Sequence, residues 1–146
     1  SLTQLYDDLI DVLEKEFTLC TQLVELLQKE RDVIVSLDPR ALESLLGEKE
    51  SITTMIRVCD ETRKRILESL GFKDKTISEV AETAENGYRE RLTYIASKFK
   101  SIINSISELN RFNSILIEKS LYYIKTSYNF LNTFDITPRQ KVSLEA

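Results

Sequence analysis

The sequence predicts an all-α protein, folded as an elongated antiparallel three-helix bundle of the coiled-coil type. Apolar residues recur at steps of three and four through most of the 146 residues, which is the period of one helix face. The chain has only three Gly and two Pro, too few for the many tight turns of a β-sandwich or barrel. The breaks between periodic segments are short, which favours antiparallel neighbours. We therefore expect a single helical domain over residues 1–134 with negligible strand content.

The first predicted helix covers about residues 2–37. Glu16 and Glu30 interrupt its apolar seam. A second apolar row lies beside this seam, so the stripe is wider than a two-stranded coiled coil needs, and the helix is expected to touch two neighbours. The seam is Leu2, Leu5, Leu9, Val12, Leu19, Leu23, Leu26, Val33 and Leu37, and the second row is Tyr6, Leu13, Cys20, Leu27 and Ile34.

The second predicted helix covers about residues 39–70. Asp38 is a good N-cap, and Pro39 suits the first helical position, where no backbone N–H is needed. Lys49 and Arg63 are the polar positions of its seam. The apolar positions are Leu42, Leu45, Ile52, Ile56, Cys59, Ile66 and Leu70.

The third predicted helix covers about residues 77–134. Gly71 ends the preceding helix, and Thr76 with Glu79 forms a capping box that starts the next one. Residues 86–87, an Asn-Gly pair, either kink this helix or divide it. Its seam then runs through Leu92, Ile95, Phe99, Ile102, Ile106, Leu109, Asn113, Leu116, Ser120, Tyr123, Ser127, Phe130 and Phe134.

Composition excludes several functions. Twenty basic and twenty-four acidic residues give a net charge of -4 without a basic block, so nucleic acid is not expected as a partner. The sequence contains no run of about 18 apolar residues, so no membrane-spanning segment is predicted, and no signal peptide is visible. The chain has no histidine and no glycine-rich phosphate loop, so we expect neither an enzyme nor a cofactor. Cys20 and Cys59 are expected to be reduced and buried.

The end of the third helix, residues 112–134, is apolar on nearly every side. Only Glu118, Lys119 and Lys125 are charged, and twelve of these 23 residues are aromatic or large aliphatic. A helix that is apolar all round is either covered or presents a binding surface. The ends of the first two helices are one possible cover, and a second chain is the other; we favour the second chain. Residues 135–146 show no apolar period and are predicted to be a flexible tail.

Asn113 occupies a seam position, where a buried amide needs hydrogen-bond partners. Two roles stay open for it. A lone Asn in a seam controls the register of the helices. Alternatively, its amide bonds a partner's backbone.

Three segments together resemble the FlgN-type flagellar export chaperones. The first helix ends in "LVELLQKERDVIVSLD", the second begins with "LESLLGEKESI", and the third contains "LNRFNSILIEKSL". The N-x-x-N pattern of Asn110 and Asn113, followed by aliphatic residues, is the most specific piece. The sequence has no tryptophan, which some family members carry in the third helix.

The resemblance implies a cytoplasmic, non-enzymatic chaperone that binds the hook-filament junction proteins FlgK and FlgL and brings them to the export gate protein FlhA. A disordered, amphipathic segment of such a client suits the apolar end of the third helix. A structural coiled-coil or adaptor protein that homodimerises through this surface, with no client, is the alternative. We predict that the client contacts Asn113, as a polar anchor, together with Ile115, Leu116, Tyr122, Tyr123, Ile124 and Tyr128.

Overall fold

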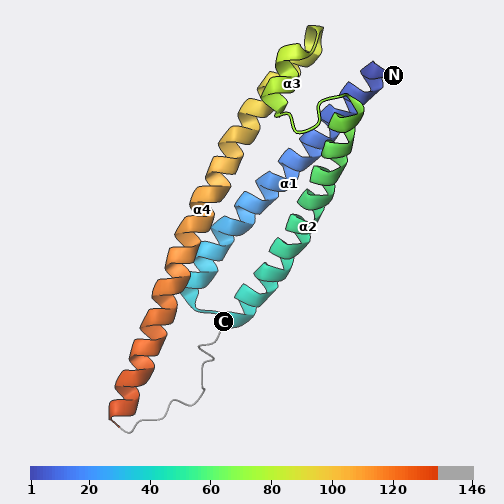
Figure 1. Ribbon diagram of the computed structural model, residues 1–146. Helices are drawn as coiled ribbons and strands as arrows, with labels where there is room; N and C mark the ends of the chain where they lie inside the picture. The colour runs from blue at the N-terminus through green and yellow to red at the C-terminus, as the bar shows by residue number, and fades with distance from the viewer. Residues whose placement is uncertain (135–146) are drawn as a thin grey trace.

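The computed structural model describes residues 1–134, which form four helices and no strand (Figure 1). The helices are α1 (Leu2–Ser36), α2 (Pro39–Ser69), α3 (Ile77–Thr83) and α4 (Asn86–Thr133). The all-α prediction is therefore confirmed. The predicted tail, residues 135–146, lies outside the described residues. Within the described part of the chain, no helix combines the length and apolar character needed to cross a membrane.

Two of the predicted helix boundaries have the expected chemistry. Oδ1 of Asp38 accepts hydrogen bonds from the backbone N–H groups of Arg40 and Ala41 at 3.1 and 3.2 Å, and Pro39 is the first residue of α2. Gly71, just beyond the end of α2, has a φ of 84°, a conformation that glycine adopts without a steric penalty. Both ends of α2 are therefore set by local sequence.

The third predicted helix is divided into α3 and α4, which is one of the two alternatives left open for the Asn-Gly pair at residues 86–87. α3 begins as predicted, with the backbone N–H of Glu79 donating to Oγ1 of Thr76 at 3.1 Å. Residues 84–85 then have extended backbone and end the helix. This break lets α3 fold against the first turns of α4 (Figure 1). Val80 of α3 is fully buried. We infer that burying the apolar face of α3 stabilises the fold more than the helical hydrogen bonds through residues 84–85 would.

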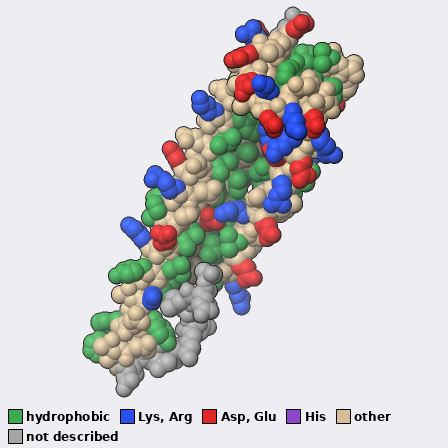
Figure 2. Space-filling view, in the orientation of Figure 1, with side chains coloured by type: hydrophobic (Ala, Val, Ile, Leu, Met, Phe, Trp, Pro, Cys, Tyr) green, Lys and Arg blue, Asp and Glu red, His purple; other side chains and the backbone are tan. Residues whose placement is uncertain are grey.

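The three long helices differ from the predicted three-helix bundle in their packing. α1 is central and packs against α2 on one side and α4 on the other. Among the described residues, no Cα atom of α2 comes within 8 Å of one in α4. The expected contact of the first helix with two neighbours is thus confirmed, while the two neighbours stay apart. Apolar side chains gather along the strip between α2 and α4 (Figure 2).

Two aromatic pairs show that α4 runs parallel to α1. The rings of Tyr6 and Tyr88 stack with centroids 5.1 Å apart, and those of Phe17 and Phe99 meet edge to face at 5.7 Å. Both pairs are offset by 82 residues, so Ser36 at the end of α1 is level with about residue 118 of α4. The last turns of α4 consequently extend beyond the α1–α2 turn (Figure 1). We call this part of α4, residues 119–133, the overhang.

Candidate protein-binding surface

A buried polar cluster joins the three long helices above the overhang. Nδ2 of Asn113 on α4 donates to the backbone oxygen of Leu27 and to Oε1 of Glu30 on α1, both at 2.9 Å. Nζ of Lys49 on α2 lies 2.9 Å from Oε2 of the same Glu30. Asn113 and Glu30 are 1% and 2% exposed. We call Asn113, Glu30 and Lys49 the Glu30 cluster; through it, α2 and α4 bond to the same carboxylate.

This cluster determines where the amide of Asn113 points. Both hydrogen bonds of its Nδ2 atom go to α1, while its Oδ1 atom is buried without a hydrogen-bond partner. Asn110, one turn earlier, is exposed. In this arrangement, Asn113 holds α4 in register against α1, and its amide reaches a partner only if α4 moves away from α1.

A second ion pair crosses the α1–α2 interface nearer the other end of the hairpin. Nε of Arg63 lies 3.0 Å from Oε1 of Glu16, and Arg63 also bonds Asp60 on its own helix. The two acids on α1 are 14 residues apart, as are the two bases on α2, so both pairs satisfy one antiparallel register. The sequence alone shows these two acids and two bases as polar positions within apolar seams. Their equal spacing and opposite charges were the signal that could have predicted the two ion pairs.

Two carboxyl groups around Arg63 have shifted pKa values in opposite directions. Burial raises the pKa of Glu16, and the nearby charge of Asp60 adds to this, although the guanidinium of Arg63 opposes it. The hydrogen bond from Lys64 is the main reason that the pKa of Asp60 is lowered; partial burial opposes this shift and Arg63 supports it. The α1–α2 interface therefore contains one carboxylate whose charge is costly and one whose charge is favoured.

The predicted client-contacting residues do not share one face of α4. Tyr122 and Tyr123 are 72% and 67% exposed, and Ile115 is also exposed. Tyr122 and Tyr123 line a shallow hollow of about 400 Å³ together with Phe130 and neighbouring residues of the overhang. We call Tyr122, Tyr123 and Phe130 the outer aromatic surface. The other predicted residues are half-buried (Leu116, Ile124 and Tyr128) or buried (Asn113).

A second apolar hollow, which sequence reasoning missed, lies at the α1–α2 turn. Its volume is about 420 Å³. One wall is the inner face of α4 and the other is the end of α1 with the start of α2. We call it the turn trough; its apolar lining is Val33, Ile34, Leu37, Pro39 and Leu42 on one wall and Ile117, Leu121 and Ile124 on the other. The sequence gives little signal for it, because the two walls are about 80 residues apart in the chain.

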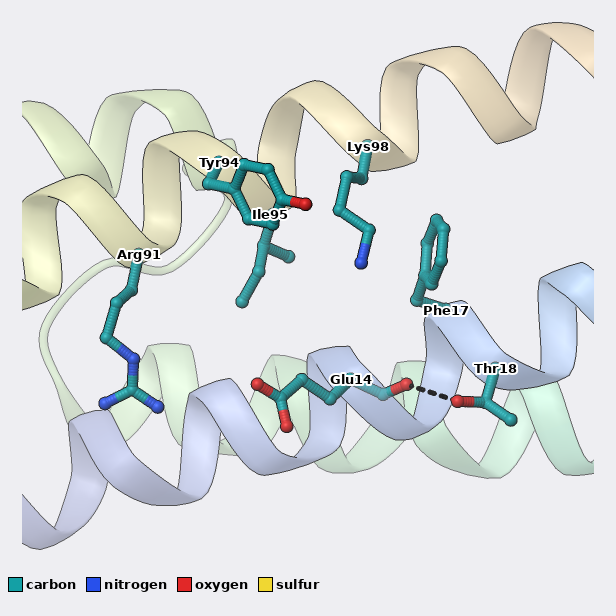
Figure 3. Close-up of a pocket in the computed structure, with 7 residues that line it drawn as sticks. All are labelled: Glu14, Phe17, Thr18, Arg91, Tyr94, Ile95 and Lys98. Carbon is teal, nitrogen blue, oxygen red and sulfur yellow. Dashed lines mark hydrogen bonds between the residues drawn. The ribbon is translucent and has the colours of Figure 1, made fainter.

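A third hollow, of about 280 Å³, lies between α1 and α4 (Figure 3). Figure 3 shows the side chain of Lys98 on α4 directed toward the ring of Phe17 on α1. Nζ of Lys98 is 4.1 Å from the centroid of that ring and 5.3 Å from the centroid of Tyr94. Arg91 of α4 and Glu14 of α1 also line the hollow. The cation–π contact stabilises the pairing of α1 with α4, so we assign this hollow a structural role.

The comparison with protein families identifies the chain. The sequence model described as FlgN protein matches residues 5–135, which include nearly all of the four helices. The chain belongs to the FlgN family. FlgN proteins are flagellar export chaperones, so this FlgN chain has a role in flagellum assembly by binding flagellar proteins. No curated protein and no solved structure matches the sequence significantly. The matched region of this FlgN protein contains the Glu30 cluster, the outer aromatic surface and the turn trough.

Proposed function

We propose that this FlgN protein is a cytoplasmic chaperone of type III flagellar export that binds hook-filament junction proteins of the FlgK and FlgL type. It prevents their premature association and delivers them to an export gate protein of the FlhA type. It acts as a binding protein, without catalysis and without a cofactor. Family membership supports the general role, and the exposed aromatic residues of the overhang carry the assignment of the site.

The overhang has the surface that such a role needs. Tyr122, Tyr123 and Phe130 are each more than 60% exposed, with Phe130 about two turns after the two tyrosines on the same helix. Contiguous exposed apolar groups of this kind mark interaction sites in soluble proteins. Tyrosine is favoured there because its ring buries a large area at low entropic cost while its hydroxyl group stays hydrated.

A client segment that is disordered in the free state fits this surface. An amphipathic segment places its apolar face on α4 and folds as it binds. Ordering the segment costs conformational entropy, which keeps the affinity low enough for release at the gate. We place client contact on Ile115, Leu116, Tyr122, Tyr123, Ile124 and Tyr128. Asn113 is buried against α1 and is not part of this surface. It contacts the client directly only if client binding moves α4 away from α1.

A pull-down from a lysate of flagellated cells tests this function. The wild-type protein should recover FlgK-type or FlgL-type proteins, and the Tyr122→Ala/Tyr123→Ala variant should recover much less of them. Tyr94→Ala is the matched control, because Tyr94 is similarly exposed on α4 but lies in the first half of the helix. Recovery of unrelated proteins only, in equal amounts with all three proteins, would contradict the chaperone function.

The alternative is a structural or adaptor protein that dimerises through the overhang and has no client. The same exposed aromatic residues favour this alternative, since a second copy would cover them equally well. Light scattering separates the two functions. A monomer that forms a 1:1 complex with a junction protein supports the chaperone, whereas a permanent dimer that binds no junction protein supports the alternative.

A further inference from the structure

We infer that a helix of the client occupies the turn trough, where it continues the path of α1 along the inner face of the overhang. This inference rests on the proposed function, because it requires a client. It adds a second contact region to the outer aromatic surface and names the conformation that the client takes there.

The first observation is the continuity of the α1–α4 interface. On α4, Ile95 and Asn113 are buried against α1, and Ile117, Leu121 and Ile124 follow Asn113 at steps of three and four. α1 ends at Ser36, level with about residue 118 of α4. The apolar face of α4 therefore continues past the helix that covers it. A segment that packs there takes the position that α1 would have if it were longer.

The second observation is the chemistry of the trough. Among the described residues, Asp38 is the one charged residue that lines it, and Oδ1 of Asp38 already accepts the two amides that cap α2. Ser120 adds a single hydroxyl group, and the other lining residues that the structure describes are apolar. The volume of about 420 Å³ is within the range of roughly 300–1,000 Å³ that is typical of ligand pockets. The trough therefore selects apolar side chains and not a charged group.

The third observation fixes the extent of the contact. Glu30 and Asn113 are buried and bonded one helical turn above Ile34 and Ile117, so the Glu30 cluster closes the upper end of the trough. From Ile117 to Leu131, near the end of α4, this face of the helix spans about 21 Å at 1.5 Å per residue. An occupant of about four helical turns, with apolar residues at positions i, i+3 or i+4, and i+7, matches this length.

A helix fits the trough better than an extended strand does. The backbone groups of α4 are bonded within the helix and present no open edge for pairing with a strand. A helix satisfies its own backbone and needs only an apolar face. A second copy of this chain is poorly suited as its source, because the apolar faces of its α1 and α2 are already buried in its own core. A second copy would have to place its own overhang in the trough.

The test uses two charge substitutions, one on each wall of the trough, in the full chain. Leu37→Glu changes a residue that is 49% exposed at the end of α1, and Leu121→Glu changes the opposite wall on the overhang. Val35→Glu is the matched control, because Val35 is 67% exposed on the same turn of α1 and does not line the trough. Circular dichroism and urea denaturation check that each variant is folded. The probes are purified FlgK-type and FlgL-type proteins of the same organism, titrated by calorimetry.

Leu37→Glu and Leu121→Glu should each raise the Kd for the junction protein by about tenfold or more, because each places a charge in an apolar contact. Val35→Glu should leave the Kd within about twofold of wild type. A photo-crosslinking residue at position 42 should capture a segment of the junction protein that is helical in the complex.

Other outcomes overturn the inference in distinguishable ways. If the junction protein binds and depends on Tyr122 and Tyr123 but is unaffected by both trough variants, the proposed function stands and the trough is not its site. If position 42 crosslinks to residues 135–146 of the same chain, or to a second copy, equally with and without the client, another segment occupies the trough. If neither junction protein binds the wild type, the proposed function fails and the inference fails with it.

Discussion

Nδ2 of Asn113 lies 2.9 Å from Oε1 of Glu30, and both side chains are almost completely buried between α4 and α1. The other carboxylate oxygen of Glu30 bonds Lys49 of α2. A single carboxylate of α1 therefore bonds side chains of both helices that flank α1. α1 continues to Ser36, so this bond lies within the last two turns over which α1 covers α4.

Replacement of Asn113 by Ala should destabilise the protein by about 1–3 kcal/mol, because it leaves one buried oxygen of Glu30 without a donor and removes the additional hydrogen bond to the backbone oxygen of Leu27. Asn113→Asp should cost more, since it places a second carboxylate against Glu30. Urea denaturation followed by circular dichroism measures both. Asn110→Ala is the control, because Asn110 is exposed one turn away. Equal effects at both positions would show that Asn113 has no special structural role.

Lys49→Ala should destabilise the protein by about 1–3 kcal/mol, since Glu30 then keeps its buried charge without its cation. The comparison is Lys64→Ala. Lys64 pairs with Asp60 on the surface of α2 and is 70% exposed, so its removal should cost less than about 1 kcal/mol. If Lys49→Ala costs no more than Lys64→Ala, the ion pair with Glu30 does not couple α2 to α1.

Glu16 and Asp60 should give opposite dependences of stability on pH. The pKa of Glu16 is raised in the folded state, so the folded protein binds a proton that the unfolded chain releases above about pH 4.5. Relative to Glu16→Gln, the wild type should therefore gain stability as the pH falls through the raised pKa. The pKa of Asp60 is lowered, so its contribution is present above about pH 3.8 and is lost as the pH falls below that value.

The measurement for these two groups is urea denaturation between pH 3 and 7 of the wild type, Glu16→Gln and Asp60→Asn. The difference in the free energy of unfolding between wild type and each variant isolates one carboxyl group. A difference for Glu16→Gln that does not move in favour of the wild type on acidification would contradict the raised pKa.

Substitution of Tyr123 by Asp should leave the fold intact, because this side chain is 67% exposed. The expected change in the free energy of unfolding is within about 0.5 kcal/mol, as for other surface substitutions away from structural features. Thermal denaturation checks this. Tyr6→Asp is the contrasting variant, since Tyr6 is buried and stacked on Tyr88, and it should destabilise severely. Unfolding by Tyr123→Asp would show that the outer aromatic surface is part of the core.

Local chemistry in the sequence determined the helices and most of their ends. The apolar period of three and four identified α1 and α2, and the N-caps Asp38 and Thr76 placed the starts of α2 and α3. These features depend on residues within one or two turns of each other, which is why they can be predicted without the fold. The exposed tyrosines of α4 were also found this way, because an apolar excess on a single helix is visible in its sequence.

Tertiary structure alone decided that the third predicted helix divides instead of kinking, that it does so at residues 84–85, and that α2 stays apart from α4. It also decided that Asn113 bonds Glu30, and that Leu37 and Leu121 line one trough. Each of these relationships joins residues through packing or brings together residues far apart in the chain. They depend on the register between helices, and that register follows from which apolar faces are buried together and not from any local period.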